Sequence, residues 1–163
     1  DHADGGVLAE GEIDRPYAVI GSDPECEIAL NDPALPRRLA AVQVFGDRVT
    51  VFPFDTLAPF PLTPASPWRV GRFTLSRTDS RADAGPNPLQ TDVPSGSPKV
   101  SLQVLGGTGA WGMTRRVAFV GSSAPCTVRL DSDDVSDVHA CLLVAADGVW
   151  AVDLLSDTGT RVN

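Results

Sequence analysis

The chain has 163 residues, with 13 basic and 21 acidic side chains and a formal charge of −8. This length suits one ordinary domain or two small ones, and a hydrophobic content of 42% is enough to form a buried core. The acidic balance argues against binding to nucleic acid or to an anionic membrane surface, because basic patches supply most of that affinity. No apolar run approaches the ~20 residues of a transmembrane helix, so we expect no membrane insertion.

The ends and the cysteines of the sequence bear on its cellular context. The sequence begins without Met and has no signal-peptide pattern, so we expect it to be an excerpt or a mature piece of a longer protein. Its three cysteines, Cys26, Cys126 and Cys141, show no C-x-x-C pairing. We expect them to be buried free thiols in a reducing compartment, which predicts a cytoplasmic protein.

Short β-branched runs separated by Pro and Gly predict strands throughout the chain. In the first half they fall at residues 15–20, 26–30, 40–45, 48–54 and 68–76, and closely spaced prolines disfavour helix there. In the second half they fall at residues 99–105, 116–120, 126–130, 140–145 and 149–155. This spacing of short strands is typical of an all-β sandwich or barrel.

The two halves of the chain align without a gap at an offset of 100 residues. The segment VIGSDPECEIAL matches FVGSSAPCTVRL, and the aligned pairs include Gly21 with Gly121, Ser22 with Ser122, and Cys26 with Cys126. The match continues to Phe54 and Leu154, with apolar positions alternating as in paired strands. Convergent β patterning can mimic part of this match. The ungapped agreement of turn, cysteine and strands nevertheless predicts one module present twice.

A proline-rich stretch separates the two copies. Residues 80–98 contain four prolines and no apolar periodicity, which is typical of a linker. We therefore expect a first module at residues 1–79, a Pro/Gly/Ser-rich linker at residues 80–98 and a second module at residues 99–163. The first copy ends with a loop and a strand that the second copy lacks, so we expect the second module to be truncated at its C-terminus. We also expect the native chain to continue beyond both ends.

The second copy carries a recognisable order of motifs: V-G-S, C-T-V-R-L, V-S-D-V-H-A and S-D-T-G-T-R-V-N. This order resembles the forkhead-associated (FHA) domain. The resemblance covers roughly residues 19–79 and 99–163, and it is more specific in the second copy. It implies two tandem β-sandwiches whose loops, in the family, bind phosphothreonine peptides.

The resemblance also implies a phosphate-binding cradle, from which both copies depart. The family's arginine after the loop glycine, which would hold phosphate, is Ser22 in the first copy and Ser122 in the second. The family's loop serine, a hydroxyl donor to phosphate, is Ser136 in the second copy, but Pro36 donates nothing in the first.

Further cradle positions differ between the copies. The residue beside the loop serine, commonly Arg or Asn in the family, is Asp137 in the second copy, whereas the first has Arg37 followed by Arg38. The loop histidine, mainly architectural in the family, is His139. The late asparagine that grips the peptide backbone falls at Thr158, which follows an acidic residue, Asp157.

Charge decides how we interpret these loops. A phosphothreonine carries about −1.5 to −2 charges, and in the second copy it would meet Asp137 and Asp157 with no arginine opposite. Repulsion on the order of kilocalories outweighs the ~1 kcal/mol that one hydroxyl, from Ser136, contributes. We expect phosphate recognition to be lost or weakened there. In the first copy we expect Arg37 and Arg38 to be solvated arginines on a turn, with an anion site as the alternative.

No other motif indicates catalysis, a cofactor or a metal. The acidic run at residues 131–137 lacks the glycine and the closing glutamate of an EF-hand. The glycine-rich residues 106–112 predict a hairpin turn, since no Lys-Ser/Thr and no helix follow them. Gly71 and Arg72 resemble the missing Gly-Arg pair, but we place them inside the last strand of the first copy.

The sequence thus predicts a non-catalytic interaction or scaffolding module of bacterial type. Its partner would be another protein or a second copy of itself. Two alternatives stay open. One is true phosphothreonine-peptide binding through Arg37, Arg38 and Ser136. The other is a regulatory or structural segment of a larger enzyme, such as a kinase.

Overall fold

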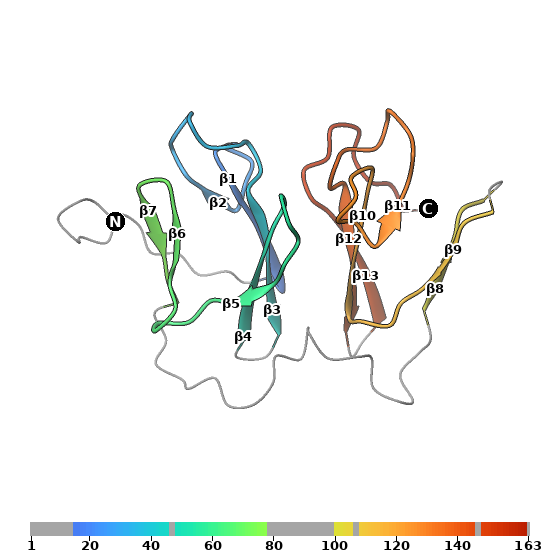
Figure 1. The fold of residues 1–163 in the computed structure, drawn as a ribbon, viewed down its shortest axis with the longest axis horizontal. Helices are drawn as coiled ribbons and strands as arrows, with labels where there is room; N and C mark the ends of the chain where they lie inside the picture. Colours follow the sequence, from blue (N-terminus) through green and yellow to red (C-terminus); the bar gives the residue numbers. More distant parts are fainter. Residues whose placement is uncertain (1–14, 46–47, 78–99, 106–107, 146–147, 163) are drawn as a thin grey trace. The chain divides into compact units, whose positions relative to one another are not determined.

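The computed structural model describes residues 15–45, 48–77, 100–105, 108–145 and 148–162. These residues form thirteen β-strands and no helix, which confirms the all-β prediction. It follows that the described part of the chain has no helix long and apolar enough to cross a membrane. The chain divides into two compact units, unit 1 (residues 1–85) and unit 2 (residues 86–163), and each is described by itself (Figure 1). The predicted linker, residues 80–98, lies outside the described residues.

Unit 1 is built on a five-stranded sheet with the order β2-β1-β3-β4-β5. Its strands are β1 (Tyr17–Gly21), β2 (Ile28–Ala29), β3 (Ala40–Phe45), β4 (Arg48–Pro53) and β5 (Phe60–Pro61). β1 and β2 pair in parallel and the other neighbours are antiparallel. The sequence did not indicate β5, because a two-residue strand that contains Pro61 carries no alternation.

A second layer covers one face of this sheet. It is the hairpin of β6 (Trp68–Val70) and β7 (Phe73–Leu75). Apolar side chains of the hairpin pack against a buried cluster that includes Ile20, Val42 and Val51. The predicted single strand at residues 68–76 is therefore wrong: Gly71 has a positive φ of 54° and forms the turn with Arg72. Glycine tolerates this conformation without the steric penalty of a Cβ.

Unit 2 repeats the sheet and carries a different hairpin. Its four-stranded sheet has the order β11-β10-β12-β13 and comprises β10 (Val117–Gly121), β11 (Val128–Arg129), β12 (Ala140–Ala145) and β13 (Gly148–Asp153). Before it, β8 (Ser101–Gln103) pairs with β9 (Ala110–Gly112). The glycine-rich stretch thus connects two paired strands, and its last three residues belong to β9.

The strand registers of the two units differ by 100 residues at every shared pairing. Ile20 lies opposite Ala40 in unit 1, as Val120 lies opposite Ala140 in unit 2. The parallel pairs of β1 with β2 recur in β10 with β11, and those of β3 with β4 recur in β12 with β13. A one-residue slip would turn every side chain to the other face, so the shared register places equivalent residues at equivalent positions.

Candidate functional site

Loops gather at one end of each sheet (Figure 1). In unit 2 the first loop is residues 122–127, the second is residues 130–139, and the third follows β13 at residues 154–162. In unit 1 the corresponding first and second loops are residues 22–27 and 30–39. Most of the residues that the sequence singled out lie on these loops.

Backbone hydrogen bonds tie the first loop to the second in the same way in both units. In unit 2 the amides of Ser122 and Ser123 donate to the carbonyls of Ser136 and Asp137 at 3.1 Å each. In unit 1 the equivalent bonds, from residues 22 and 23 to residues 36 and 37, measure 3.0 and 3.1 Å. The glycine before each first loop permits this close approach, because a Cβ on Gly121 would clash with the Asp137 carbonyl. The backbone frame is therefore common to both units.

A buried cysteine adds a second donor at the same carbonyl. Cys126 Sγ donates to the Asp137 carbonyl at 3.2 Å, and Cys26 Sγ donates to the Arg37 carbonyl at 3.5 Å. Burial raises the pKa of both thiols, to about 11 for Cys26, where Asp23 and Glu27 add to the effect. All three cysteines are buried and free, as the sequence indicated. These thiols therefore support the loops and are poorly suited to act as nucleophiles.

In unit 2 the two serines that the resemblance places at phosphate-donor positions face carboxylates. Ser122 Oγ donates to Asp137 Oδ1 at 3.4 Å, and Ser136 Oγ donates to Asp157 Oδ2 at 3.3 Å. The amide of Asp157 in turn donates to Ser136 Oγ at 3.0 Å. Both hydroxyl protons are thus directed at acceptors within the protein. An incoming phosphate would have to compete with two carboxylates for them.

The third loop is joined to the second by Thr158 and His139. Thr158 Oγ1 donates to the carbonyl of Asp134 at 2.7 Å. His139 is only 9% exposed, and its Nδ1 accepts the amide of Ser136 at 3.1 Å. A neutral ring that accepts at Nδ1 carries its proton on Nε2, which lies 3.2 Å from the carbonyl of Gly159 and donates to it. His139 therefore links two loops, which is the architectural role expected from the resemblance.

Asp153, at the end of β13, organises the third loop and was not singled out in the sequence. Its carboxylate accepts Ser156 Oγ at 2.7 Å, Thr160 Oγ1 at 2.6 Å and the Ser156 amide at 2.9 Å. Burial raises the pKa of this carboxyl, but the hydrogen bonds from Thr160 and Ser156 outweigh burial and lower it overall. Asp153 is therefore ionised at neutral pH and fixes the loop that presents Asp157 and Thr158.

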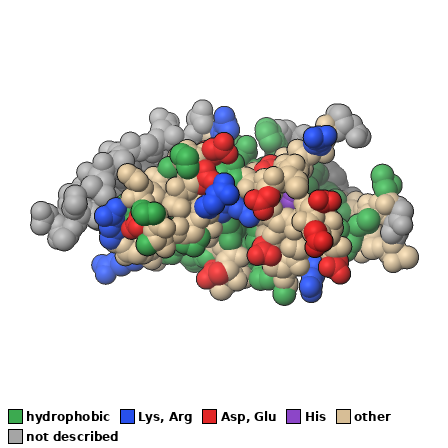
Figure 2. Space-filling view, turned by 90° about the horizontal axis from the view of Figure 1, so that it is seen from above, with side chains coloured by type: hydrophobic (Ala, Val, Ile, Leu, Met, Phe, Trp, Pro, Cys, Tyr) green, Lys and Arg blue, Asp and Glu red, His purple; other side chains and the backbone are tan. Residues whose placement is uncertain are grey.

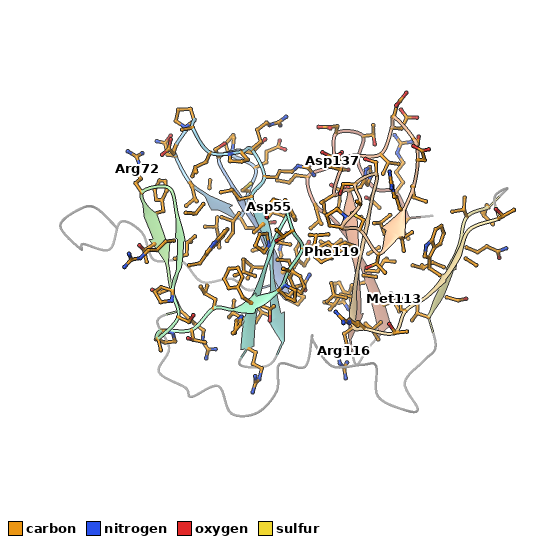
Figure 3. All side chains as sticks on the ribbon, in the orientation of Figure 1. Asp55, Arg72, Met113, Arg116, Phe119 and Asp137 are labelled. Atoms are coloured by element: carbon orange, nitrogen blue, oxygen red, sulfur yellow. The ribbon has the colours of Figure 1, made fainter. Side chains whose placement is uncertain are left out.

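The loop end of unit 2 carries an acidic surface. Figure 2 looks onto the loop ends and shows acidic side chains gathered over the loops of unit 2. Asp137, labelled in Figure 3, projects from this end. The exposed carboxylates on these loops are Asp131, Asp133, Asp134, Asp137 and Asp157. Within the described residues no group of His, Cys, Asp and Glu is arranged to hold a metal ion.

Unit 1 uses the same loop frame with a different set of side chains. Ser22 Oγ donates to the carbonyl of Leu35 at 2.9 Å, so this hydroxyl is also directed inward. Arg37 donates through Nε and Nη2 to Oδ2 of Asp23, at 2.9 and 2.6 Å. Hydrogen bonds from the amide of Glu25 and from Arg37 lower the pKa of the Asp23 carboxyl. Arg37 therefore makes an ion pair that the sequence did not indicate, while its side chain remains 78% exposed.

The other arginines at this end also make specific contacts. The guanidinium of Arg38 lies 6.0 Å from the centre of the Phe54 ring, and the residue is half-buried. Arg72, labelled in Figure 3, donates to the carbonyl of Asn31 at 2.9 Å, and its Nε lies 3.5 Å from Asp32 Oδ2. The Gly71-Arg72 turn thus packs onto the second loop.

The structure therefore brings predicted site residues together in unit 2 but not in unit 1. It brings Ser122 to Asp137, and it brings Ser136 to Asp157, whereas Ser22 and Arg37 have separate partners. The residue that sequence reasoning missed in unit 1 is Asp23. A signal was present in the offset alignment, where Asp23 with Arg37 in one copy becomes serine with aspartate in the other.

Comparison with known proteins adds one finding on this geometry. Residues 118–163 match the family model of the FHA domain, a family of phosphopeptide-binding, generally non-catalytic interaction modules. The matched residues run from β10 to the third loop, so they contain every loop contact of unit 2 described above. No curated protein and no solved structure matches the chain. The second half of the chain is thus similar to an FHA domain.

Proposed function

We propose that the chain is a tandem pair of FHA-like units that serves as a non-catalytic protein-interaction or scaffolding module, with lost or weakened phosphothreonine recognition. The tandem arrangement is supported by the strand registers and loop hydrogen bonds that recur at an offset of 100 residues. The partner is another protein or a second copy of the chain. The reduced thiols favour a cytoplasmic setting.

The observation that carries this proposal is the engagement of the phosphate donors by carboxylates. In unit 2, Ser122 donates to Asp137 and Ser136 donates to Asp157. In unit 1, Arg37 donates to Asp23. These three donor side chains therefore already have an internal carboxylate as a partner. A phosphate group with about −1.5 to −2 charges would displace one of these contacts and meet like charge.

Titration of the full chain with matched peptides tests the proposal. The probes are a degenerate phosphothreonine peptide library and the same library unphosphorylated, followed by calorimetry or NMR. We expect no difference in affinity between the two libraries. Phosphate-dependent binding in the micromolar range would instead favour the alternative, a working phosphothreonine reader that uses Arg37, Arg38 and Ser136.

A gain-of-function pair examines unit 2 directly. Ser122→Arg restores the family's arginine, but Asp137 lies 3.4 Å from the serine oxygen and will hold the new guanidinium. The double variant S122R/D137N removes that carboxylate. We expect phosphate-dependent binding to rise in the double variant and to stay near the wild-type level in S122R alone. A gain in S122R alone would contradict a blocking role of Asp137.

A further inference from the structure

Arg37 in unit 1 already holds an anion, the carboxylate of Asp23. Two guanidinium N–H groups donate to Oδ2, at 2.9 and 2.6 Å, and the amide of Glu25 donates to Oδ1 at 3.0 Å. An arginine fork combined with a backbone amide is also how proteins hold a phosphate group. Asp23 thus occupies a set of donors that suits a phosphate monoester.

The carboxylate of this pair is fixed, whereas the arginine is accessible. The side chain of Asp23 is 9% exposed and that of Arg37 is 78% exposed. The backbone braces Asp23 on both sides, since its amide donates to the Arg37 carbonyl at 3.1 Å and its carbonyl accepts the Cys26 amide at 3.1 Å. A ligand that approaches Arg37 from solvent therefore meets a guanidinium whose Nε and Nη2 already donate to a carboxylate that the backbone holds in place.

We propose that Asp23 is an internal substitute for a phosphate ligand, and that it keeps the loops of unit 1 from binding a phosphorylated side chain. This inference rests on the proposed function, because it explains how a loop with an arginine beside the serine position can be silent toward phosphate. The phosphate would have to break two charge-assisted hydrogen bonds and then lie beside the charge of Asp23.

Asparagine at position 23 tests the role of the charge. Asp23→Asn retains a carbonyl oxygen that accepts the Glu25 amide, but it removes the charge that holds Arg37. We titrate the wild-type chain and D23N with a short peptide that has one central phosphothreonine, and with the unphosphorylated peptide. We expect D23N to bind the phosphopeptide at least about tenfold more tightly than wild type, since charge-assisted hydrogen bonds are among the strong ones.

Two further variants show whether the gain passes through this pair. D23N/R37Q lacks the guanidinium and is expected to lose the gain. Asp32→Asn removes a carboxylate that faces Arg72 on the same loops, at 3.5 Å, and is expected to bind like wild type. Asp23→Ser, which copies the residue of unit 2, gives a second test if D23N unfolds, and thermal unfolding of each variant shows whether it is folded.

The outcomes separate this inference from the proposed function. Equal affinity of wild type and D23N for the phosphopeptide overturns the role of Asp23, and so does a gain that persists in D23N/R37Q. Tight phosphate-dependent binding by the wild-type chain contradicts the proposed function instead. A gain in D23N that R37Q removes supports both.

Discussion

The loops of units 1 and 2 share a backbone and differ in charge chemistry. In both units a glycine leaves room for one backbone carbonyl of the second loop, and a buried cysteine donates to that carbonyl. It belongs to Arg37 in unit 1 and to Asp137 in unit 2. In unit 1 that residue is a cation held by Asp23. In unit 2 it is an anion near Ser122.

The shared backbone and the different charges show that two sets of residues have separate roles: one sets the path of the loops, and the other determines which ligand the loops can bind. Strand register, the glycine and the buried thiol recur because they set the path of the backbone. The side chains that reach solvent are free of that constraint, and at positions 37 and 137 they carry opposite charges. A match to a family through the frame therefore does not transfer its ligand, which depends on the loop side chains.

The largest expected effect on stability comes from substituting the glycine that precedes the first loop in each unit. Gly121→Ala places a Cβ against the Asp137 carbonyl and within 2.8 Å of Cys126 Sγ, and Gly21→Ala meets the Arg37 backbone. Backbone atoms cannot move aside as a flexible side chain can, so we expect each variant to lower the free energy of unfolding by about 3 kcal/mol or more. Urea unfolding measures the loss.

Gly112→Ala is the matched control for both variants. Gly112 also lies in a strand, but a Cβ there would contact nothing within 4 Å. We expect G112A to unfold within about 0.5 kcal/mol of wild type. If G21A and G121A behaved like G112A, or differed widely from each other, the two units would not share one frame.

A smaller effect is expected at His139, where the units differ. His139→Leu copies Leu39 of unit 1, fills the site with an apolar side chain and removes both ring hydrogen bonds. The Ser136 amide and the Gly159 carbonyl lose their partners, so we expect a local loss of about 2 kcal/mol. Amide exchange at Ser136 should then accelerate by more than about tenfold, whereas amides of β10 should be unaffected. Unchanged exchange at Ser136 would show that the loops are joined without the histidine.

Sequence alone predicted the frame well and the loop contacts poorly. Alternating apolar runs specified β1, β3, β4, β10, β12 and β13, because burial on a sheet leaves a period of two. β5 was missed because two residues carry no period, and the turn at Gly71 was missed because apolar residues flank it on both sides. The partner of Arg37 was missed because Asp23 lies 14 residues away and meets it only through the loop frame.

The last and smallest effect concerns how the loops of each unit respond to acid. The carboxylate that matters is Asp23 in unit 1 and Asp153 in unit 2. The hydrogen bonds to Asp153 outweigh burial and lower its pKa, and the Glu25 amide and Arg37 lower that of Asp23. A lowered pKa in the folded state means that the stabilising charge is fully present above the ordinary carboxyl pKa, ~3.9. The stabilisation is lost as the pH falls through the lower, folded-state pKa. Both loop ends should therefore stay ordered at neutral pH and loosen only in acid below about pH 4.

Thr160→Val separates the two carboxylates. It removes a donor 2.6 Å from Asp153 and leaves Asp23 untouched. Because one bond that stabilises the ionised form is lost, we expect the pKa of Asp153 to rise and the third loop of unit 2 to loosen at a higher pH than in wild type. Carboxyl carbon shifts followed by NMR over the acid range measure both residues in one sample.

Thr158→Val is the control, since Thr158 donates to a backbone carbonyl and its loss should leave the Asp153 titration in place. An unchanged Asp153 midpoint in T160V would mean that the hydrogen bonds from Ser156, rather than the Thr160 hydroxyl, keep the pKa of Asp153 low. The acid response of unit 2 would then no longer depend on a contact that unit 1 lacks.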